Sequence, residues 1–173
     1  PDLAVREVSP RIRQDVALIA DELLRVRFEP PEPFHDVRFW PLGLPGAGDP
    51  FDTRIDRLLV VSPFLGAARL DTLVVADRGD VLVSRCDELD QVPSETLERF
   101  GEVLHLSDFA TSDELTSADD AEAASDEDAP VGLHAKLYVG DAGREAHVWT
   151  GSANATEAAF SRNVEILVQL TGK

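Results

Sequence analysis

Residues 133–170 read LHAKLYVGDAGREAHVWTGSANATEAAFSRNVEILVQL, and this stretch decides the fold that the sequence predicts. From Leu133 to Val139, apolar or small residues alternate with His134, Lys136 and Tyr138. Alternation with a period of two is typical of a strand with one apolar face. We therefore expect an imidazole and an ammonium group side by side on one face of a rigid element.

A turn of small residues, Gly151–Asn154, follows the next predicted strand, Ala146–Thr150. It leads into a helical pattern at Ala155–Phe160. The hydroxyl of Ser152, the carboxamide of Asn154 and the free backbone N–H groups at a helix start are suitable donors for a phosphate. Together with the neighbouring cation and imidazole, they predict a site for a phosphodiester.

The arrangement of His134, Lys136 and Asp141, H-x-K-x-x-x-x-D, followed by GSAN and then by Glu165, resembles the HKD signature of the phospholipase D superfamily. In that family the motif histidine attacks phosphorus and forms a phosphohistidine, and the resemblance implies this role for His134. Lys136 would bind a non-bridging phosphate oxygen and stabilise the charge that develops there. The resemblance implies neither a metal ion nor any other cofactor.

Glu165 lies inside an otherwise apolar predicted strand, Val164–Leu170. A carboxylate in such surroundings needs a partner, because burying an unpaired charge is costly. The resemblance implies that this partner is the nucleophilic histidine, so Glu165 is predicted to orient His134, as a carboxylate orients a histidine in other triads.

The remaining motif residues are assigned to binding and support. By the resemblance, Ser152 and Asn154 donate hydrogen bonds to the same phosphate oxygens as Lys136. Asp141 is predicted to support the architecture more than the chemistry, and its place after Gly140 also fits a hairpin turn. The predicted catalytic set is thus His134, Lys136, Glu165 and Asp141, and the predicted phosphate-binding set is Lys136, Ser152 and Asn154.

Members of the family use two copies of the motif, one histidine acting as nucleophile and the other as general acid. This chain has one copy, because Lys136 and Lys173 are its only lysines and no second H-x-K exists. The other half of the site is therefore predicted to come from a homodimer or from a second motif-bearing domain of a longer polypeptide. The start at Pro1, without a methionine, fits an excised portion of something longer.

Three functions remain open from the sequence. The first is a metal-independent phosphodiesterase that resembles bacterial nucleases, with nucleic acid favoured over lipid as substrate. The second is a phospholipase or phosphatidyl transferase, which would need an apolar surface or a basic amphipathic helix beside the site. The third is a module that binds phosphate or nucleic acid without turnover in this form.

Composition sets further limits. The formal net charge of −17 argues against general electrostatic binding to nucleic acid or to an anionic membrane. The single cysteine, Cys86, cannot form an internal disulfide, and no Cys/His cluster has metal-ligand spacing. Neither a signal peptide nor a membrane-spanning run is visible, so a cytoplasmic protein without membrane insertion is expected.

The rest of the chain predicts one α/β domain over 1–173, a mixed central sheet with helices on both faces, which matches one half of a phospholipase D-like sandwich. Segment 1–50 combines a helix at Ser9–Arg25, with Ser9 as N-cap, and a Pro-rich stretch. Strands are expected at 57–65, 81–84 and 103–106, a helix at 94–100, and a strand or short helix at 70–75. The acidic segment 107–130 is expected to be a mobile surface loop, either a solvated insertion or an acidic flap.

Four further residues have two interpretations each. His35, Phe39 and Trp40 could line a groove, but an edge segment that packs its aromatics on the domain is the favoured interpretation. His147 could be a second acid or base, but a structural histidine is favoured. None of the four is assigned to the site.

Overall fold

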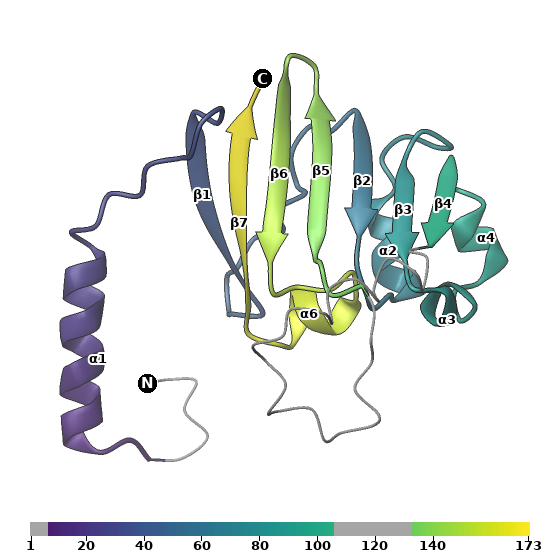
Figure 1. Ribbon diagram of the computed structural model, residues 1–173. Coiled ribbons are helices and arrows are strands. Elements are labelled where there is room, and N and C mark those ends of the chain that lie inside the picture. The colour runs from purple at the N-terminus through teal and green to yellow at the C-terminus, as the bar shows by residue number, and fades with distance from the viewer. Residues whose placement is uncertain (1–6, 106–132) are drawn as a thin grey trace, which may run out of the picture.

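The structure is a computed structural model that describes residues 7–105 and 133–173, so the predicted acidic loop at 107–130 lies outside the described residues. Its centre is a seven-stranded mixed sheet in the order β1-β7-β6-β5-β2-β3-β4 (Figure 1). The strands are β1 Asp36–Leu42, β2 Arg57–Val61, β3 Val81–Ser84, β4 Glu102–His105, β5 Leu137–Ala142, β6 Glu145–Gly151 and β7 Glu165–Gly172. The described helices are α1 Pro10–Leu23, α2 Ala67–Leu73, α3 Cys86–Leu89, α4 Ser94–Leu97 and α6 Glu157–Ser161.

The sheet has a parallel part and an antiparallel part. Strands β2, β3 and β4 are parallel to one another, and helices lie in the connections between them. In the series β5, β6, β7 and β1, each strand is antiparallel to its neighbour. Strand β5 joins the two parts by pairing antiparallel with β2. The predicted α/β class with a mixed sheet is confirmed.

Local sequence features explain the element boundaries. The N-cap Ser9 accepts a hydrogen bond from the backbone N–H of Ile12 at 3.4 Å, and Pro10 occupies the first helical position of α1, as predicted. The apolar run at 70–75, predicted as a strand or a short helix, is helical up to Leu73, where α2 ends, and Val74 is already extended. The strand predicted at 81–84 is β3.

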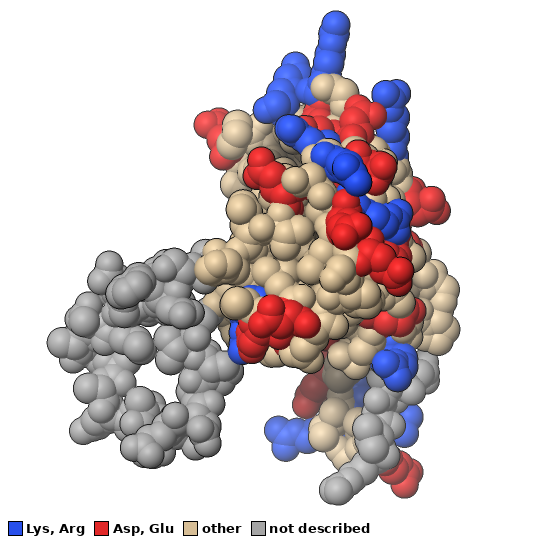
Figure 2. Space-filling view, turned by 90° about the vertical axis from the view of Figure 1, so that its right-hand side faces the viewer, with Lys and Arg blue, Asp and Glu red and all other residues tan. Residues whose placement is uncertain are grey.

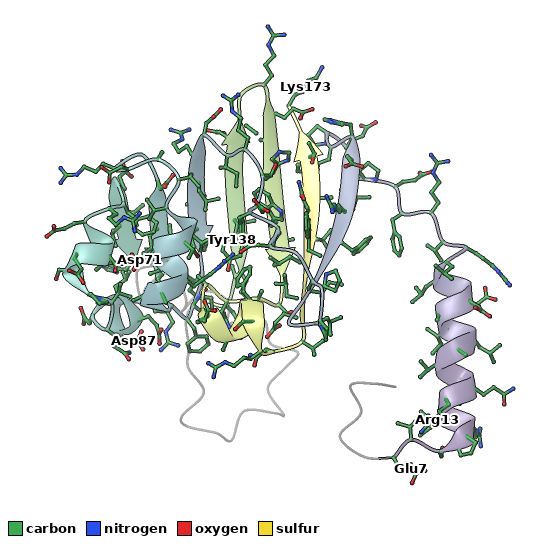
Figure 3. The ribbon with its side chains drawn as sticks, turned by 180° about the vertical axis from the view of Figure 1, so that it is seen from behind. Glu7, Arg13, Asp71, Asp87, Tyr138 and Lys173 are labelled. Carbon is green, nitrogen blue, oxygen red and sulfur yellow. The ribbon has the colours of Figure 1, made fainter. Side chains whose placement is uncertain are left out.

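One face of the sheet carries the core. Alternate residues of the strands point into it together with residues of α2, α6 and their flanking segments, and Figure 3 shows these elements in front of the strands. The buried apolar residues are Leu42, Leu58, Val60, Leu70, Leu73, Leu82, Val92, Phe100, Tyr138, Trp149, Ala153, Ala155, Ala159 and Leu167.

The second face of the sheet differs from the prediction of helices on both faces. The strand residues of the opposite parity, such as Leu59, Val83, Val139 and Val168, are apolar, yet none of them is buried. No described helix packs over this second face, and the strands are seen unobstructed in Figure 1. We call it the open face. It is hollowed by a shallow depression of about 360 Å³ where β2, β3 and β5 meet.

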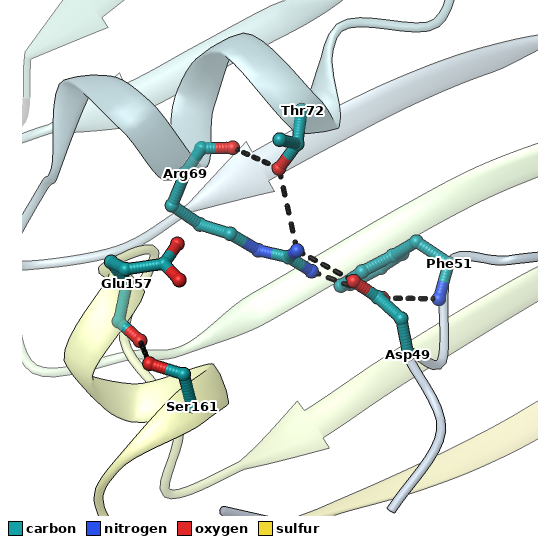
Figure 4. Close-up of polar contacts among 6 residues, drawn as sticks. All are labelled: Asp49, Phe51, Arg69, Thr72, Glu157 and Ser161. Atoms are coloured by element: carbon teal, nitrogen blue, oxygen red, sulfur yellow. Dashed lines mark hydrogen bonds and ion pairs between the residues drawn. The ribbon is translucent and has the colours of Figure 1, made fainter.

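Arg69 of α2 fastens the chain segment before β2 to the core (Figure 4). Its buried guanidinium contacts both carboxylate oxygens of Asp49, at 2.6 and 3.1 Å, and the hydroxyl of Thr72 at 3.3 Å. The guanidinium carbon also lies 3.7 Å from the centre of the Phe160 ring on α6. One cation therefore links a loop and two helices beneath the sheet.

We expect Asp49→Asn to lower the free energy of unfolding at pH 7 by about 1–2 kcal/mol, because charge-assisted hydrogen bonds to a buried guanidinium are lost. Burial raises the pKa of Asp49, but hydrogen bonds from Arg69 and from the Phe51 backbone, with the charge of Arg69, hold it below its ordinary 3.8. The contribution is therefore complete above the pKa of the unfolded state and is lost as the pH falls through the lower folded pKa.

Urea denaturation of Asp49→Asn and the unsubstituted protein at pH 7 and at pH 3 measures this. The difference in free energy should be smaller at pH 3, and a difference that grows toward acid would contradict the assignment.

Candidate active site

All the predicted site residues except Asp141 lie in segments at one end of the strands, the end at the bottom of Figure 1. Strands β2, β3 and β6 end at this edge, and β5 and β7 begin there, because β5 is antiparallel to β2 and β6, and β7 is antiparallel to β6. The segments at this edge hold His134, Lys136, Ser152, Asn154 and Glu165. Residues far apart in sequence thus meet along one rim, which we call the motif edge.

His134 and Lys136 lie in the extended segment that precedes β5, whereas the sequence predicted them inside a strand. The hydroxyl of Thr150 donates to the carbonyl of Lys136 at 3.1 Å and anchors the segment to β6. The ammonium of Lys136 donates to the carbonyl of His134 at 3.1 Å. The ring of His134 is exposed and makes no hydrogen bond to any described residue.

Ser152 is held by two hydrogen bonds to the start of β7. Its backbone N–H donates to the carbonyl of Ile166 at 3.0 Å, and its hydroxyl oxygen accepts from the N–H of Ile166 at 3.1 Å. The hydroxyl hydrogen is not used in either bond. Ser152 can therefore donate to a ligand while it keeps β6 and β7 in register.

Asn154 occupies a turn that the sheet holds tightly. The phenolic hydroxyl of the buried Tyr138 donates to the carbonyl of Ala153 at 3.0 Å, and the N–H of Ala155 donates to the hydroxyl of Ser62 at 2.9 Å. The side-chain oxygen of Asn154 is buried and has no hydrogen-bond partner among the described residues. A buried polar atom of this kind is normally satisfied by water or a ligand.

Ser62 was not predicted from the sequence, yet its hydrogen bonds connect the end of β2 to β3 and to the GSAN turn. Besides accepting from Ala155, its hydroxyl donates to the carbonyl of Phe64 at 2.7 Å, and its carbonyl accepts from the hydroxyl of Ser84 at 2.7 Å. The useful pattern in the sequence was the tripeptide Ser62-Pro63-Phe64 at the end of an apolar run, since polar residues often follow strand ends in sites of this class of fold.

Glu165 begins β7 opposite Leu42 of β1 and is half-buried. Its carboxylate makes no hydrogen bond or ion pair with any described residue. The predicted contact between Glu165 and the ring of His134 is therefore not formed in this structure, although both residues lie at the motif edge.

Asp141 lies at the other end of β5, away from the motif edge. Its carboxylate pairs with Arg57 of β2 at 2.8 Å, and its side chain is 49% exposed. It sits within the strand, since the hairpin turn comes later, at Gly143. The structure thus does not bring Asp141 together with His134, and the Arg57 pair ties β5 to β2 at the far edge.

His147 is held within the sheet. Its Nδ1 lies 3.1 Å from the Thr171 hydroxyl and 3.2 Å from the side-chain nitrogen of Gln169. Trp40 of the edge strand β1 donates to the same Gln169 at 2.7 Å. These contacts agree with the favoured interpretations of His147 as a structural histidine and of Trp40 as an edge aromatic.

Charge and ligand groups limit the chemistry of the site. Across the residues that the structure describes, no three His, Cys, Asp or Glu side chains gather where they could hold a metal ion. Figure 2, which views the molecule from the β4 side, shows acidic and basic side chains interspersed rather than a continuous basic patch. None of the described helices has the length and apolar character to cross a membrane.

No protein-family model matches the chain, and a search among curated proteins finds no match. Chemically, the motif edge offers the imidazole of His134, the ammonium of Lys136, and hydroxyl and amide groups around them. This set suits a tetrahedral anion whose central atom is open to attack.

Proposed function

We propose that the protein is a metal-independent phosphodiesterase, nuclease-like in substrate, that acts through a phosphohistidine at His134. The observation that carries the proposal is the exposed ring of His134, which bonds to no described residue, at a rim that also holds Lys136, Ser152 and Asn154. A nucleophile must be accessible, and the groups that bind the anion must surround it.

In the proposed first step, a lone pair on a ring nitrogen of His134 attacks phosphorus, a P–N bond forms, and the P–O bond to the leaving group breaks. The leaving alkoxide takes a proton from a second, protonated imidazole. In the second step that imidazole takes a proton from water, the water oxygen attacks phosphorus, and the P–N bond breaks. Both histidines regain their starting state.

Lys136 and Ser152 stabilise the charge in this scheme. The ammonium of Lys136 is already positioned within 3.1 Å of the backbone of His134, so it can reach an oxygen on the phosphorus that this ring attacks. The hydroxyl of Ser152 donates to a second oxygen. Fixed donors of this kind act most strongly on the extra negative charge of the pentacovalent state.

The second imidazole has to come from another molecule or domain, since this chain has one motif. We propose that a second copy of the chain supplies it by packing open face against open face. Seven strands about 4.8 Å apart span roughly 29 Å. With strands about 20 Å long, the open face measures roughly 600 Å², at the upper limit of apolar patches on monomers and near the ~800 Å² per partner of a stable interface.

The proposed site requires one particular symmetry of this dimer. Packed sheets lie about 10 Å apart. A two-fold axis parallel to the strands leaves both motif edges at the same end of the dimer, whereas an axis perpendicular to the strands sends them to opposite ends. Only the first arrangement lets two copies of His134 act on one phosphate.

Val168→Lys tests this dimer, because it places a charge on the open face, halfway along β7. We expect light scattering to give twice the chain mass for the unsubstituted protein and the chain mass for Val168→Lys. Val75→Lys makes the same change at an exposed valine outside the open face and should leave the dimer intact. The measurement is made at about 100 micromolar protein, well above typical dimer dissociation constants. A mass of one chain for the unsubstituted protein would contradict the proposal.

The activity itself is tested by incubating the protein with labelled oligonucleotides in excess EDTA. Cleavage is expected, because no step uses a metal. Release of headgroup from lipid vesicles without cleavage of oligonucleotides would favour the phospholipase alternative, and binding without turnover of either would favour the binding module.

A further inference from the structure

Phe64 lies at the motif edge, just after the end of β2, and was not among the predicted site residues. It follows β2, which is the neighbour of β5 in the sheet. The register pairs Val61 with Leu137. Beyond this pair the ladder stops, and the hydroxyl of Ser62 instead accepts from the N–H of Ala155, at the end of the GSAN turn, at 2.9 Å. Phe64 therefore lies in the segment that follows β2 at the motif edge, where the chain is tied to the predicted phosphate-binding turn.

The loop that carries Phe64 is fixed by backbone hydrogen bonds at Phe64 itself and at the two residues that follow it. The carbonyl of Phe64 accepts from Ser62 at 2.7 Å, and the N–H of Leu65 donates to the carboxylate of Glu88 at 3.0 Å. The N–H of Gly66 donates to the carbonyl of Ala155 at 2.9 Å, which ties the loop to the GSAN turn. A large apolar ring on a rigid loop loses little conformational entropy when it binds a ligand.

The ring itself is only partly covered. Phe64 is 41% exposed, and the guanidinium carbon of Arg85, at the end of β3, lies 5.6 Å from the ring centre. Arg85 is held in place by Asp87, at 2.5 and 3.1 Å. The pair presents a flat aromatic surface backed by a cation at the motif edge.

We propose that Phe64, backed by Arg85, is a stacking platform for the nucleobase next to the scissile phosphate. The inference rests on the proposed function and deepens it by naming the substrate class, a single-stranded nucleic acid or short nucleotide diester. Every base has a flat π face that can stack on a phenyl ring, whereas the glycerol and simple headgroups of phospholipids have none.

The charge of the chain agrees with a local contact of this kind. A net charge of −17 gives no long-range attraction to a polyanion, so affinity for nucleic acid has to come from short-range contacts at the site. Stacking is such a contact, and it is tolerant of sequence because it does not read base edges.

The test compares binding of two fluorescent oligomers of equal length, oligothymidylate and its abasic counterpart, by anisotropy in EDTA. The protein carries His134→Gln, which prevents turnover in the proposed mechanism. We expect tighter binding of oligothymidylate by about 5- to 150-fold, the range for one stacked base. Phe64→Ala should abolish this preference and leave the affinity for the abasic oligomer unchanged, while Phe64→Trp should keep it.

Phe28→Ala is the matched control, since Phe28 is 50% exposed and lies in the segment that leads from α1 to β1, away from the motif edge. It should keep the preference. Equal affinity for both oligomers, or an equal loss for both in Phe64→Ala, would overturn the platform, as would binding to phosphatidylglycerol vesicles that depends on Phe64.

Hydrolysis of methyl p-nitrophenyl phosphate by the unsubstituted protein separates the two proposals. Hydrolysis without any preference for the oligomer that carries bases would contradict the stacking platform and support the phosphodiesterase. A preference for bases that Phe64→Ala abolishes, without hydrolysis of the small diester or of oligonucleotides, supports the platform and sinks the phosphodiesterase.

Discussion

His134→Ala is expected to lower the rate of phosphodiester hydrolysis by about 10⁶-fold, the order of loss seen when a covalent nucleophile is removed. The same change should alter the free energy of unfolding by less than about 0.5 kcal/mol, because the ring is exposed and makes no hydrogen bond to a described residue. Single-turnover hydrolysis and urea denaturation on the same preparation measure both effects.

His35→Ala is the control for this change. His35 is also an exposed histidine, but it lies at the opposite end of the sheet from the motif edge, where its ring is 3.5 Å from Glu145. It should retain the full rate. Equal rates for His134→Ala and the unsubstituted protein would mean that another residue attacks phosphorus.

Lys136→Gln is expected to lower kcat by about 10²- to 10³-fold, the typical loss when a charge-stabilising donor is removed from the transition state. Glutamine keeps a hydrogen-bond donor of similar reach but removes the charge. KM should change much less, because the lysine acts mainly on charge that develops during the reaction. Steady-state kinetics with a small diester separate the two parameters.

Lys173→Gln provides the matched control for Lys136→Gln, because the chain has only these two lysines. It makes the same change in net charge at the C-terminus, on the far side of the sheet from the motif edge (Figure 3). A loss of rate that is the same in both variants would show a general electrostatic effect instead of a role in the site.

The period-two alternation of apolar residues predicted which strand residues are buried, but it did not predict where β5 begins. Tyr138 and Trp149 are buried on one parity, and β3 and β6 fall where the pattern puts them. Strand β5, however, starts only at Leu137. Its neighbour β2 ends before Ser62-Pro63, and a proline has no N–H for the ladder, so the alternating residues before Leu137 continue as an extended segment outside the sheet.

The prediction of a covered second face followed from residues that are apolar on both parities. Leu58 and Val60 are buried in the core, while Leu59 and Val61 of the same strand lie on the open face. The pattern reports that both faces are suited to burial, but it does not say whether the cover belongs to the same chain. This is why the predicted layer of helices is absent among the described residues and a second copy is proposed in its place.

The motif identified most of the motif edge but not its contacts. Polar residue types and spacing brought out His134, Lys136, Ser152, Asn154 and Glu165, which share one edge because their strands begin or end there. Hydrogen bonds between segments far apart in sequence, such as that from Ala155 to Ser62, depend on the strand order. No local pattern contains that order, so Ser62 and Phe64 came only from the structure.

The covalent intermediate is the most direct test of the account. The protein is mixed with an oligonucleotide carrying ³²P at the scissile phosphate in excess EDTA, quenched in base, which preserves phosphohistidine, and digested for peptide mapping. We predict a labelled peptide whose phosphate is on His134. Cleavage without any labelled peptide, or a label on a residue other than His134, would contradict the account.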